Sequence, residues 1–140
     1  MKIIIPIKVL KLQDGVHLLV QLRVNGKTAS LVLDTGASHT VFDRTQIKKF
    51  IQEENFESHD NLSVGLGTND MKSHLIVLDN IQIGKLEIRK KKSVVIDLSH
   101  LNIAYEKMNK KPVDGVLGSD ILQKYRAVID YGKRVVVLSK

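Results

Sequence analysis

The sequence predicts an all-β domain in which mainly antiparallel strands form a closed or partly closed barrel, accompanied by two short helices. The first observation is that apolar and polar residues alternate over several short stretches, as they do in half-buried strands. The second is that turn sequences separate these stretches, and the clearest of them, Asn25-Gly26, favours a two-residue type I′ hairpin. The third is size: 140 residues with 43% hydrophobic side chains can bury one substantial core, so we expect a single domain over residues 1–140.

The amino-terminal part is expected to contain a largely buried strand followed by the Asn-Gly hairpin. Pro6 interrupts the first strand and has no N–H to donate, so it should lie at a sheet edge or a bulge. Asp43 is a plausible N-cap for a helix over residues 44–53, and the polar residues 55–61 should form a loop. The strands expected in this part are residues 3–9, 18–24, 27–33 and 40–42.

The carboxy-terminal part is expected to continue as short strands joined by turns. Asp79-Asn80 is an expected turn, and the basic run 89–92 is interpreted as a solvated turn between strands. Residues 99–111 are polar and rich in lysine, with room for a short helix, and Ser119 or Asp120 should cap the last helix. The strands expected here are residues 75–78, 81–83, 85–88 and 93–98, a short buried strand within 113–118, and a final hairpin of 126–130 and 134–138.

The chain is basic: 22 lysines and arginines against 15 aspartates and glutamates give a formal charge of +7. Such a charge attracts nucleic acid or anionic lipid weakly and without specificity. Aromatic residues make up 4% of the chain, tryptophan is absent, and no aromatic–basic interleaving suits base stacking. A nucleic-acid-binding domain that uses the basic runs 89–92 and 107–111 is therefore a weaker rival, and no specific nucleic acid is expected as a partner.

Several kinds of chemistry are excluded by residue types and spacings. The chain has no cysteine, so disulfides, cysteine nucleophiles and thiolate metal sites are ruled out. The five histidines are scattered, with no pair at helical ligand spacing, and no metal or cofactor is expected. The apolar amino terminus is interrupted by Pro6 and by lysines, is too short to span a membrane and is followed by no small-residue cleavage site. We therefore expect a cytoplasmic protein without membrane contact.

One stretch combines features that catalysis requires. An apolar strand ends at Asp34, and Thr35 and Gly36 follow it, so the strand delivers one carboxylate to a tight turn. Because the hairpin partner holds this strand, the carboxylate has a rigid mount, as catalytic geometry demands. Taken alone, Asp-Thr-Gly most often marks a strand that simply ends in a turn.

A second stretch, Gly65-Leu66-Gly67, places two glycines around one leucine, with polar residues after them. This composition suits the tip of a hairpin. A phosphate-binding loop is the alternative, but no Gly-Lys-Ser/Thr follows and no helix is expected to begin here. The hairpin tip is therefore the favoured interpretation.

Three motifs stand in a recognisable order: apolar residues before Asp34-Thr35-Gly36-Ala37, the glycine-containing hairpin at 65–67, and Val116-Leu117-Gly118 before a short helix. This ordered set resembles the retropepsin-like aspartic peptidases, a family with a single-lobe acid-protease fold. Bacterial members give the closest match. Their carboxy-terminal part often has an apolar-Leu-Gly-x-Asp-x-Leu motif and then an Ile-Asp-Tyr strand, as residues 116–122 and 129–131 do here. The resemblance covers most of the chain.

The resemblance implies a role for each motif. Asp34 is the expected catalytic carboxylate, Thr35 is expected to hydrogen-bond across the base of the site in the arrangement called the fireman's grip, and Gly36 completes this catalytic motif while lining the substrate backbone. Residues 116–118 are expected to pack beneath this loop. The residues expected to bind substrate are Ala37, Ser38, Val64, Gly65, Leu66 and Gly67, the last four of which belong to a flap that closes over the substrate.

Two features depart from the retroviral members of that family. Ser38 stands where those members commonly have aspartate, so their substrate specificity cannot be carried over to this chain. The strand after the last helix is also longer than theirs, which puts a dimer interface made of interleaved termini in doubt here.

The implied reaction is the hydrolysis of peptide bonds by an aspartic endopeptidase, in which two carboxylates share one proton and activate a water held between them. The chain has one Asp-Thr-Gly, so the second carboxylate must come from Asp34 of another copy, and we expect a homodimer acting on a peptide or protein substrate. The alternative keeps the fold without catalysis, as a silent dimerisation or peptide-binding module. Turn, cap or strand-end positions account for four other aspartates, Asp97, Asp114, Asp120 and Asp130.

Overall fold

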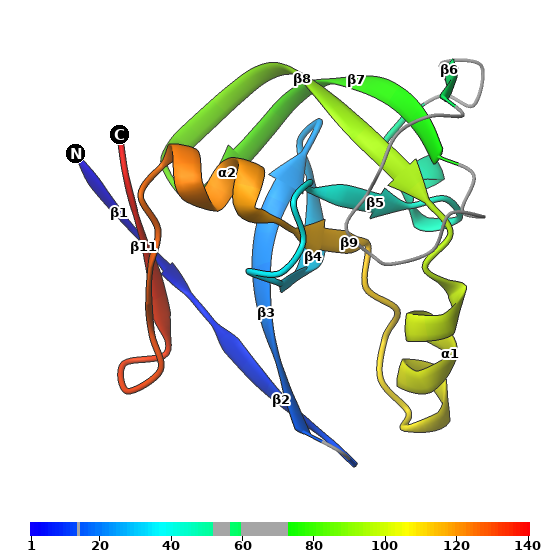
Figure 1. The fold of residues 1–140 in the computed structure, drawn as a ribbon, viewed down its shortest axis with the longest axis horizontal. Helices are drawn as coiled ribbons and strands as arrows, with labels where there is room; N and C mark the ends of the chain where they lie inside the picture. The colour runs from blue at the N-terminus through cyan, green and yellow to red at the C-terminus, as the bar shows by residue number, and fades with distance from the viewer. Residues whose placement is uncertain (14, 52–56, 60–72) are drawn as a thin grey trace.

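The computed structural model describes residues 1–13, 15–51, 57–59 and 73–140. Strands dominate, and two α-helices and one short 3₁₀ helix accompany them (Figure 1). No helix among these residues is long and apolar enough to cross a membrane. In chain order the elements are β1 (Lys2–Pro6), β2 (Lys8–Leu12), β3 (Gly15–Val24), β4 (Lys27–Leu33), β5 (Val41–Asp43), η1 (Gln46–Lys49), β6 (Glu57–His59), β7 (Ser73–Ile83), β8 (Leu86–Ile96), α1 (Ser99–Lys107), β9 (Gly115–Leu117), α2 (Ser119–Lys124), β10 (Val128–Asp130) and β11 (Val135–Ser139).

Six strands close into a barrel, which confirms the predicted fold class. They pair in the cyclic order β3–β4–β9–β5–β8–β7, and the pairs Arg23–Gln82 and Val24–Ile81 between β3 and β7 close the ring. Two of the pairings, β4 with β9 and β5 with β8, are parallel, and the others are antiparallel. β2 and β6 extend the sheet beyond the ring at its two ends.

The hairpin between β3 and β4 has the predicted turn. Asn25 and Gly26 have φ values of 50° and 83°, the left-handed conformation that a type I′ turn needs at both central residues. The Asn25 backbone N–H also donates to the carbonyl of Asn80 at 2.8 Å, which ties the hairpin to β7. The strand that leads to Asp34 is therefore held along its length by β3 and at its start by β7.

Apolar side chains from the strands fill the barrel interior. Leu31, Leu78, Leu117 and Phe42 are among the fully buried ones, and burying each such side chain stabilises the fold by about 1.5–3 kcal/mol. A second buried cluster surrounds Tyr105 of α1 and packs this helix on the outside of the barrel. Its other members include Leu10, Leu19, Val32, Val113 and Val116.

The two ends of the chain meet in a separate antiparallel sheet of three strands, in the order β1–β11–β10. Figure 1 shows both termini at the same end of this sheet, and the Met1 amino group donates to the Lys140 carbonyl at 3.2 Å. β1 is an outer strand, so Pro6 lies at a sheet edge as predicted. The terminal strands therefore pair within one chain.

The hairpin of β7 and β8 is longer and more regular than predicted. The turn expected at Asp79-Asn80 and the solvated turn expected at residues 89–92 are both wrong, because the two stretches lie inside β7 and β8, where Asn80 pairs with Arg89 and Leu78 with Lys91. Asp79 forms an ion pair with Lys90 at 2.8 Å, and Lys90 takes a φ of 51° at the one irregular point of the pairing. The loop predicted over residues 55–61 is also wrong in part, since residues 57–59 form β6 against β7.

Of the helix predicted over residues 44–53, the described part, residues 44–51, forms only the short 3₁₀ helix η1. Asp43 does accept the backbone N–H groups at the start of this turn, at 3.2 and 3.0 Å. Its other carboxylate oxygen accepts the Leu98 N–H at 2.8 Å. The same carboxylate thus joins β5 to the segment after β8, a long-range contact that a helix cap does not require.

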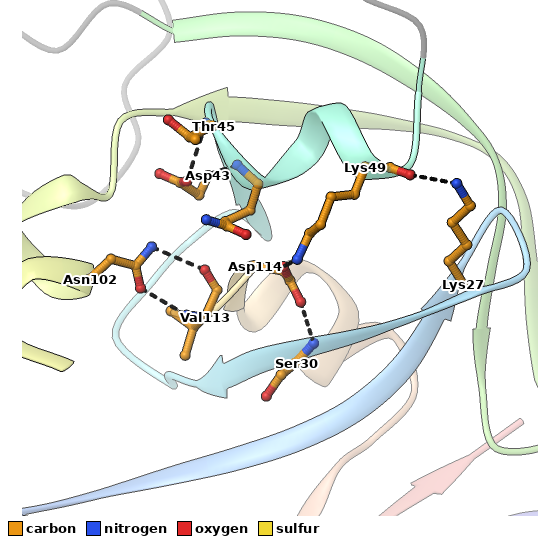
Figure 2. Close-up of polar contacts among 9 residues, drawn as sticks. Lys27, Ser30, Asp43, Thr45, Lys49, Asn102, Val113 and Asp114 are labelled. Carbon is orange, nitrogen blue, oxygen red and sulfur yellow. Dashed lines mark hydrogen bonds and ion pairs between the residues drawn. The ribbon is translucent and has the colours of Figure 1, made fainter. Parts of the chain in front are cut away.

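Two side chains of the β3–β4 hairpin donate hydrogen bonds to backbone carbonyls at the end of η1. Asn25 Nδ2 donates to the Phe50 carbonyl at 3.0 Å, and Lys27 Nζ donates to the Lys49 carbonyl at 2.9 Å. Figure 2 shows the second of these contacts. These two contacts tie the β3–β4 hairpin to the end of η1.

α1 confirms the short helix expected within residues 99–111. The Ser99 backbone N–H donates to Asp97 Oδ1 at 2.9 Å, just before the helix begins. This bond, together with one from the Ser99 side chain, holds the pKa of the Asp97 carboxyl below its usual value.

Tyr105 is expected to make the fold sensitive to high pH. Its side chain is 1% exposed, and burial raises its pKa from 10.0 to about 12. The unfolded chain therefore loses this proton at a lower pH than the folded chain. The contribution of the neutral phenol to stability is complete below pH 10 and is lost as the pH rises from 10 to about 12.

Urea unfolding of the wild type and of Tyr105→Phe across that interval measures this effect. The wild type should lose stability more steeply than the variant, which has no phenol to ionise. Parallel curves for the two proteins would contradict the expected linkage.

Candidate active site

Asp34 directly follows a barrel strand that is paired on both sides. β4 is hydrogen-bonded to β3 on one side and to β9 on the other, and Leu33, its last residue, is buried. The Asp34 backbone N–H then donates to the Leu117 carbonyl at 3.0 Å, so β9 also holds the first residue beyond the strand. This is the rigid mount that the hairpin pattern predicts.

The Asp34 loop (residues 34–40) begins with a tight turn around the carboxylate. The Gly36 N–H donates to Asp34 Oδ1 at 2.9 Å, and the Ala37 N–H donates to the Asp34 carbonyl at 3.3 Å. The Asp34 side chain is half-buried, whereas Thr35 and Gly36 are exposed. The carboxylate is thus oriented by a backbone donor and remains accessible to solvent.

The start of α2 packs against this loop, as the order of the motifs predicts. The Ser119 N–H donates to the Ala37 carbonyl at 2.7 Å. At Gly118 an added Cβ would lie 2.6 Å from the His39 carbonyl oxygen, so only glycine fits between the loop and α2. The Ala37 side chain is buried in the second cluster, the one around Tyr105.

A polar network around Asp120 holds the far end of the Asp34 loop. Asp120 Oδ1 accepts both the backbone N–H of Thr40, at 2.9 Å, and its hydroxyl, at 2.7 Å. Thr40 Oγ1 in turn accepts the Gly118 N–H at 3.0 Å, and Lys91 Nζ lies 3.5 Å from Asp120 Oδ2. Thr40 is 3% exposed, so this network is an internal brace of the loop.

The predicted cap of α2 is therefore wrong. Gly118 is the N-cap residue of this helix, and neither Ser119 nor Asp120 caps it with a side chain. The Asp120 carboxylate serves the loop instead, together with Thr40 and Lys91, to which the sequence patterns give no role in the site. The sequence signal that could have pointed to Asp120 was its position two residues after Gly118. By itself this spacing predicts a helix cap and not a contact with the Asp34 loop.

Two further buried aspartates, Asp43 and Asp114, join segments of the barrel that are far apart in the sequence (Figure 2). Asp114 Oδ2 accepts the Ser30 N–H at 2.8 Å, and Asp114 Oδ1 forms an ion pair with Lys49 Nζ at 2.6 Å. Both carboxylate oxygens of Asp43 accept backbone N–H groups. Neither Asp43 nor Asp114 has a hydrogen bond to Asp34. Both act as structural carboxylates.

A family model described as aspartyl protease matches residues 20–121, which include the whole Asp34 loop and the first turn of α2. The chain belongs to this family. A search of curated proteins finds no match.

Three solved structures share the fold of this aspartyl protease family member. A retropepsin-like aspartic protease from Rickettsia conorii aligns with a TM-score of 0.64 and 23% identity over 99% of this chain and 90% of that one. The retroviral protease-like domain of Ddi1 from Leishmania major has a TM-score of 0.58 and 14% identity over 87% of each chain. EIAV protease, solved with the inhibitor HBY-793, has a TM-score of 0.58 and 20% identity over 80% of this chain and 90% of that one. The fold is therefore retropepsin-like.

Within this aspartyl protease fold, the structure places part of the predicted site in one loop. Asp34 and the four residues after it lie in the Asp34 loop, which is hydrogen-bonded to β9 and to the start of α2. In the part of the chain that the structure describes, no second carboxylate hydrogen-bonds to Asp34. The predicted flap residues Val64, Gly65, Leu66 and Gly67 lie outside the described residues. The catalytic and substrate-binding roles of all these residues stay predictions.

Proposed function

We propose that the chain is an aspartic endopeptidase that acts as a homodimer, in which the Asp34 carboxylates of two copies form the catalytic pair. The observation that carries this proposal is the geometry of Asp34. One half-buried carboxylate stands at the end of a doubly paired strand and is oriented by the Gly36 N–H. Each chain would supply half of a site that needs two such groups.

In the proposed reaction the two carboxylates share one proton, because two like charges at close range cannot both ionise. The ionised member takes a proton from a water held between them, and the water oxygen attacks the peptide carbonyl carbon. The protonated member donates a hydrogen bond to the carbonyl oxygen, and a proton then reaches the leaving amine. The C–N bond breaks without a covalent enzyme intermediate.

The neighbouring residues take supporting roles in this proposal. Thr35 hydrogen-bonds across the base of the paired site, and Gly36, Ala37 and Ser38 line the substrate backbone. The exposed positions of Thr35, Gly36 and Ser38 are compatible with such contacts. The flap over residues 64–68 lies outside the described residues and remains a prediction from the sequence.

Digestion of an unbiased peptide library tests the function. The wild type is expected to cleave peptides internally, with activity that falls where both carboxylates are protonated or both are ionised, and with an optimum in the acidic to near-neutral range. Products that appear equally with an Asp34→Asn variant would overturn the proposal. A dimeric chain that cleaves nothing over this range would instead be a silent dimerisation or peptide-binding module.

The need for two copies predicts that activity depends on protein concentration. On dilution, the rate per mole of chain should fall as dimers dissociate, and the measured mass should fall over the same interval. Light scattering and a peptide-cleavage assay on the same dilution series check this. A monomer whose rate per mole is unchanged by dilution would contradict the shared site.

A further inference from the structure

A trough of about 1020 Å³ lies on the outside of the barrel, and no residue of the Asp34 loop lines it. One wall is residues 4–8, where β1 runs into β2, and the other is the segment 109–114 between α1 and β9. Gln21 and Ser30, which are opposite each other on β3 and β4, form part of the floor. Figure 1 shows β3 running between these two walls.

The trough is strongly basic. Lys8 on one wall and Lys110 and Lys111 on the other are exposed, and none of the three forms an ion pair with another described residue. Lys49 also lines the trough, and among the described lining residues Asp114 is the only acidic one. Three unpaired cations facing one cavity favour an anionic ligand.

Asp114 does not offset this preference for an anionic ligand, because both of its carboxylate oxygens already accept hydrogen bonds within the chain. Its side chain is 7% exposed. One oxygen is held by Lys49 and the other by the Ser30 N–H, as Figure 2 shows. The trough therefore presents cations to a ligand and no free carboxylate.

The walls are shaped for an extended polypeptide. Each is a run of consecutive residues, and both have backbone groups free to pair. β1 is an outer strand, so its edge away from β11 has no strand partner, and the Lys111 N–H has no hydrogen bond within the described chain. Ile4, which lines the trough, is 66% exposed and offers apolar contact. An added strand uses such edges for main-chain hydrogen bonds and such side chains for specificity.

We propose that this trough binds an extended, acidic segment of a partner polypeptide. Acidic side chains of the segment contact Lys8, Lys110 and Lys111, and its apolar side chains pack against the wall formed by β1. Single-stranded nucleic acid fits less well, because it is held by stacking on aromatic side chains. Among the described lining residues Tyr105 is the one aromatic, and it is 1% exposed and hydrogen-bonded to His17 at 2.8 Å. The proposal does not depend on catalysis at Asp34.

Fluorescence anisotropy at low ionic strength tests the proposal with a labelled peptide that alternates glutamate and valine. The wild type should bind it about tenfold more tightly than a glutamine–valine peptide of the same length, and added salt should weaken the binding. The double variant Lys110→Glu/Lys111→Glu should weaken binding of the acidic peptide about tenfold or more. The matched double variant Lys124→Glu/Lys133→Glu, at exposed lysines outside the trough, should change it less than about twofold.

Equal losses in the two double variants would overturn the proposal, because binding would then follow net charge rather than the trough. Absence of binding by the wild type would overturn it as well. A labelled single-stranded oligonucleotide that binds more tightly than the peptide, and depends on Lys110 and Lys111 in the same way, would assign the trough to nucleic acid. Thermal unfolding establishes that the variants are folded, and Lys8→Glu, on the opposite wall, repeats the test if the double variant is not.

Discussion

Replacing Asp34 by asparagine is expected to lower kcat/KM for peptide hydrolysis by about 10³–10⁴-fold while leaving the fold intact. Asparagine has nearly the same size as aspartate and keeps an oxygen for the Gly36 N–H, which donates to Asp34 Oδ1 at 2.9 Å. It cannot ionise or hold the shared proton, however, and in a homodimer one substitution removes both carboxylates. Steady-state kinetics on a peptide found in the library digest, together with thermal unfolding, measure the two effects separately.

Asp79→Asn is the matched control for this substitution. Its carboxylate is 73% exposed and pairs with Lys90 at the surface, where ion pairs contribute little to stability. We expect its kcat/KM to remain within about twofold of the wild type. Similar losses in both variants would show that the effect is not specific to the Asp34 loop.

Gly118→Ala is expected to reduce the free energy of unfolding by about 2–3 kcal/mol and to lower activity at the same time. The added Cβ would lie 2.6 Å from the His39 carbonyl oxygen and 2.8 Å from that of Ala37. Both oxygens belong to the backbone of the Asp34 loop, so neither can rotate away as a side chain would. Gly118 has a φ of −104°, which alanine also adopts, and the cost therefore comes from the close approach alone. Urea unfolding and peptide cleavage measure the two consequences.

Gly132→Ala provides the control, because a Cβ there would meet only Asp130 Oδ1, at 3.4 Å. This is an ordinary contact with a side chain, and we expect a change in stability below about 0.5 kcal/mol. If Gly118→Ala were as stable as this control, the loop could move away from α2, and the rigid packing described for Asp34 would be refuted.

Local sequence patterns correctly predict those strands and turns that are determined by residues close together in the chain. Asn25-Gly26 specifies its turn because few other residue pairs adopt two positive φ values. Alternation over residues 27–33 predicts the strand, which ends just before Asp34. The same local reasoning fails at Asp79-Asn80, where a turn-forming pair lies within a strand. There the pairing with β8 and the hydrogen bond to Asn25 outweigh the local preference.

The sequence by itself determined the kind of fold, the family and the carboxylate that one strand carries to its end, because these follow from periodicity and from short motifs. Only the tertiary structure decided which partners the other buried carboxylates have. Asp120 braces Thr40, 80 positions away, and Asp43 accepts the Leu98 N–H, 55 positions away. A buried charge must be satisfied by whatever donors folding brings beside it, and those donors have no fixed spacing along the chain. The basic trough depends in the same way on segments that become neighbours only when the barrel has formed.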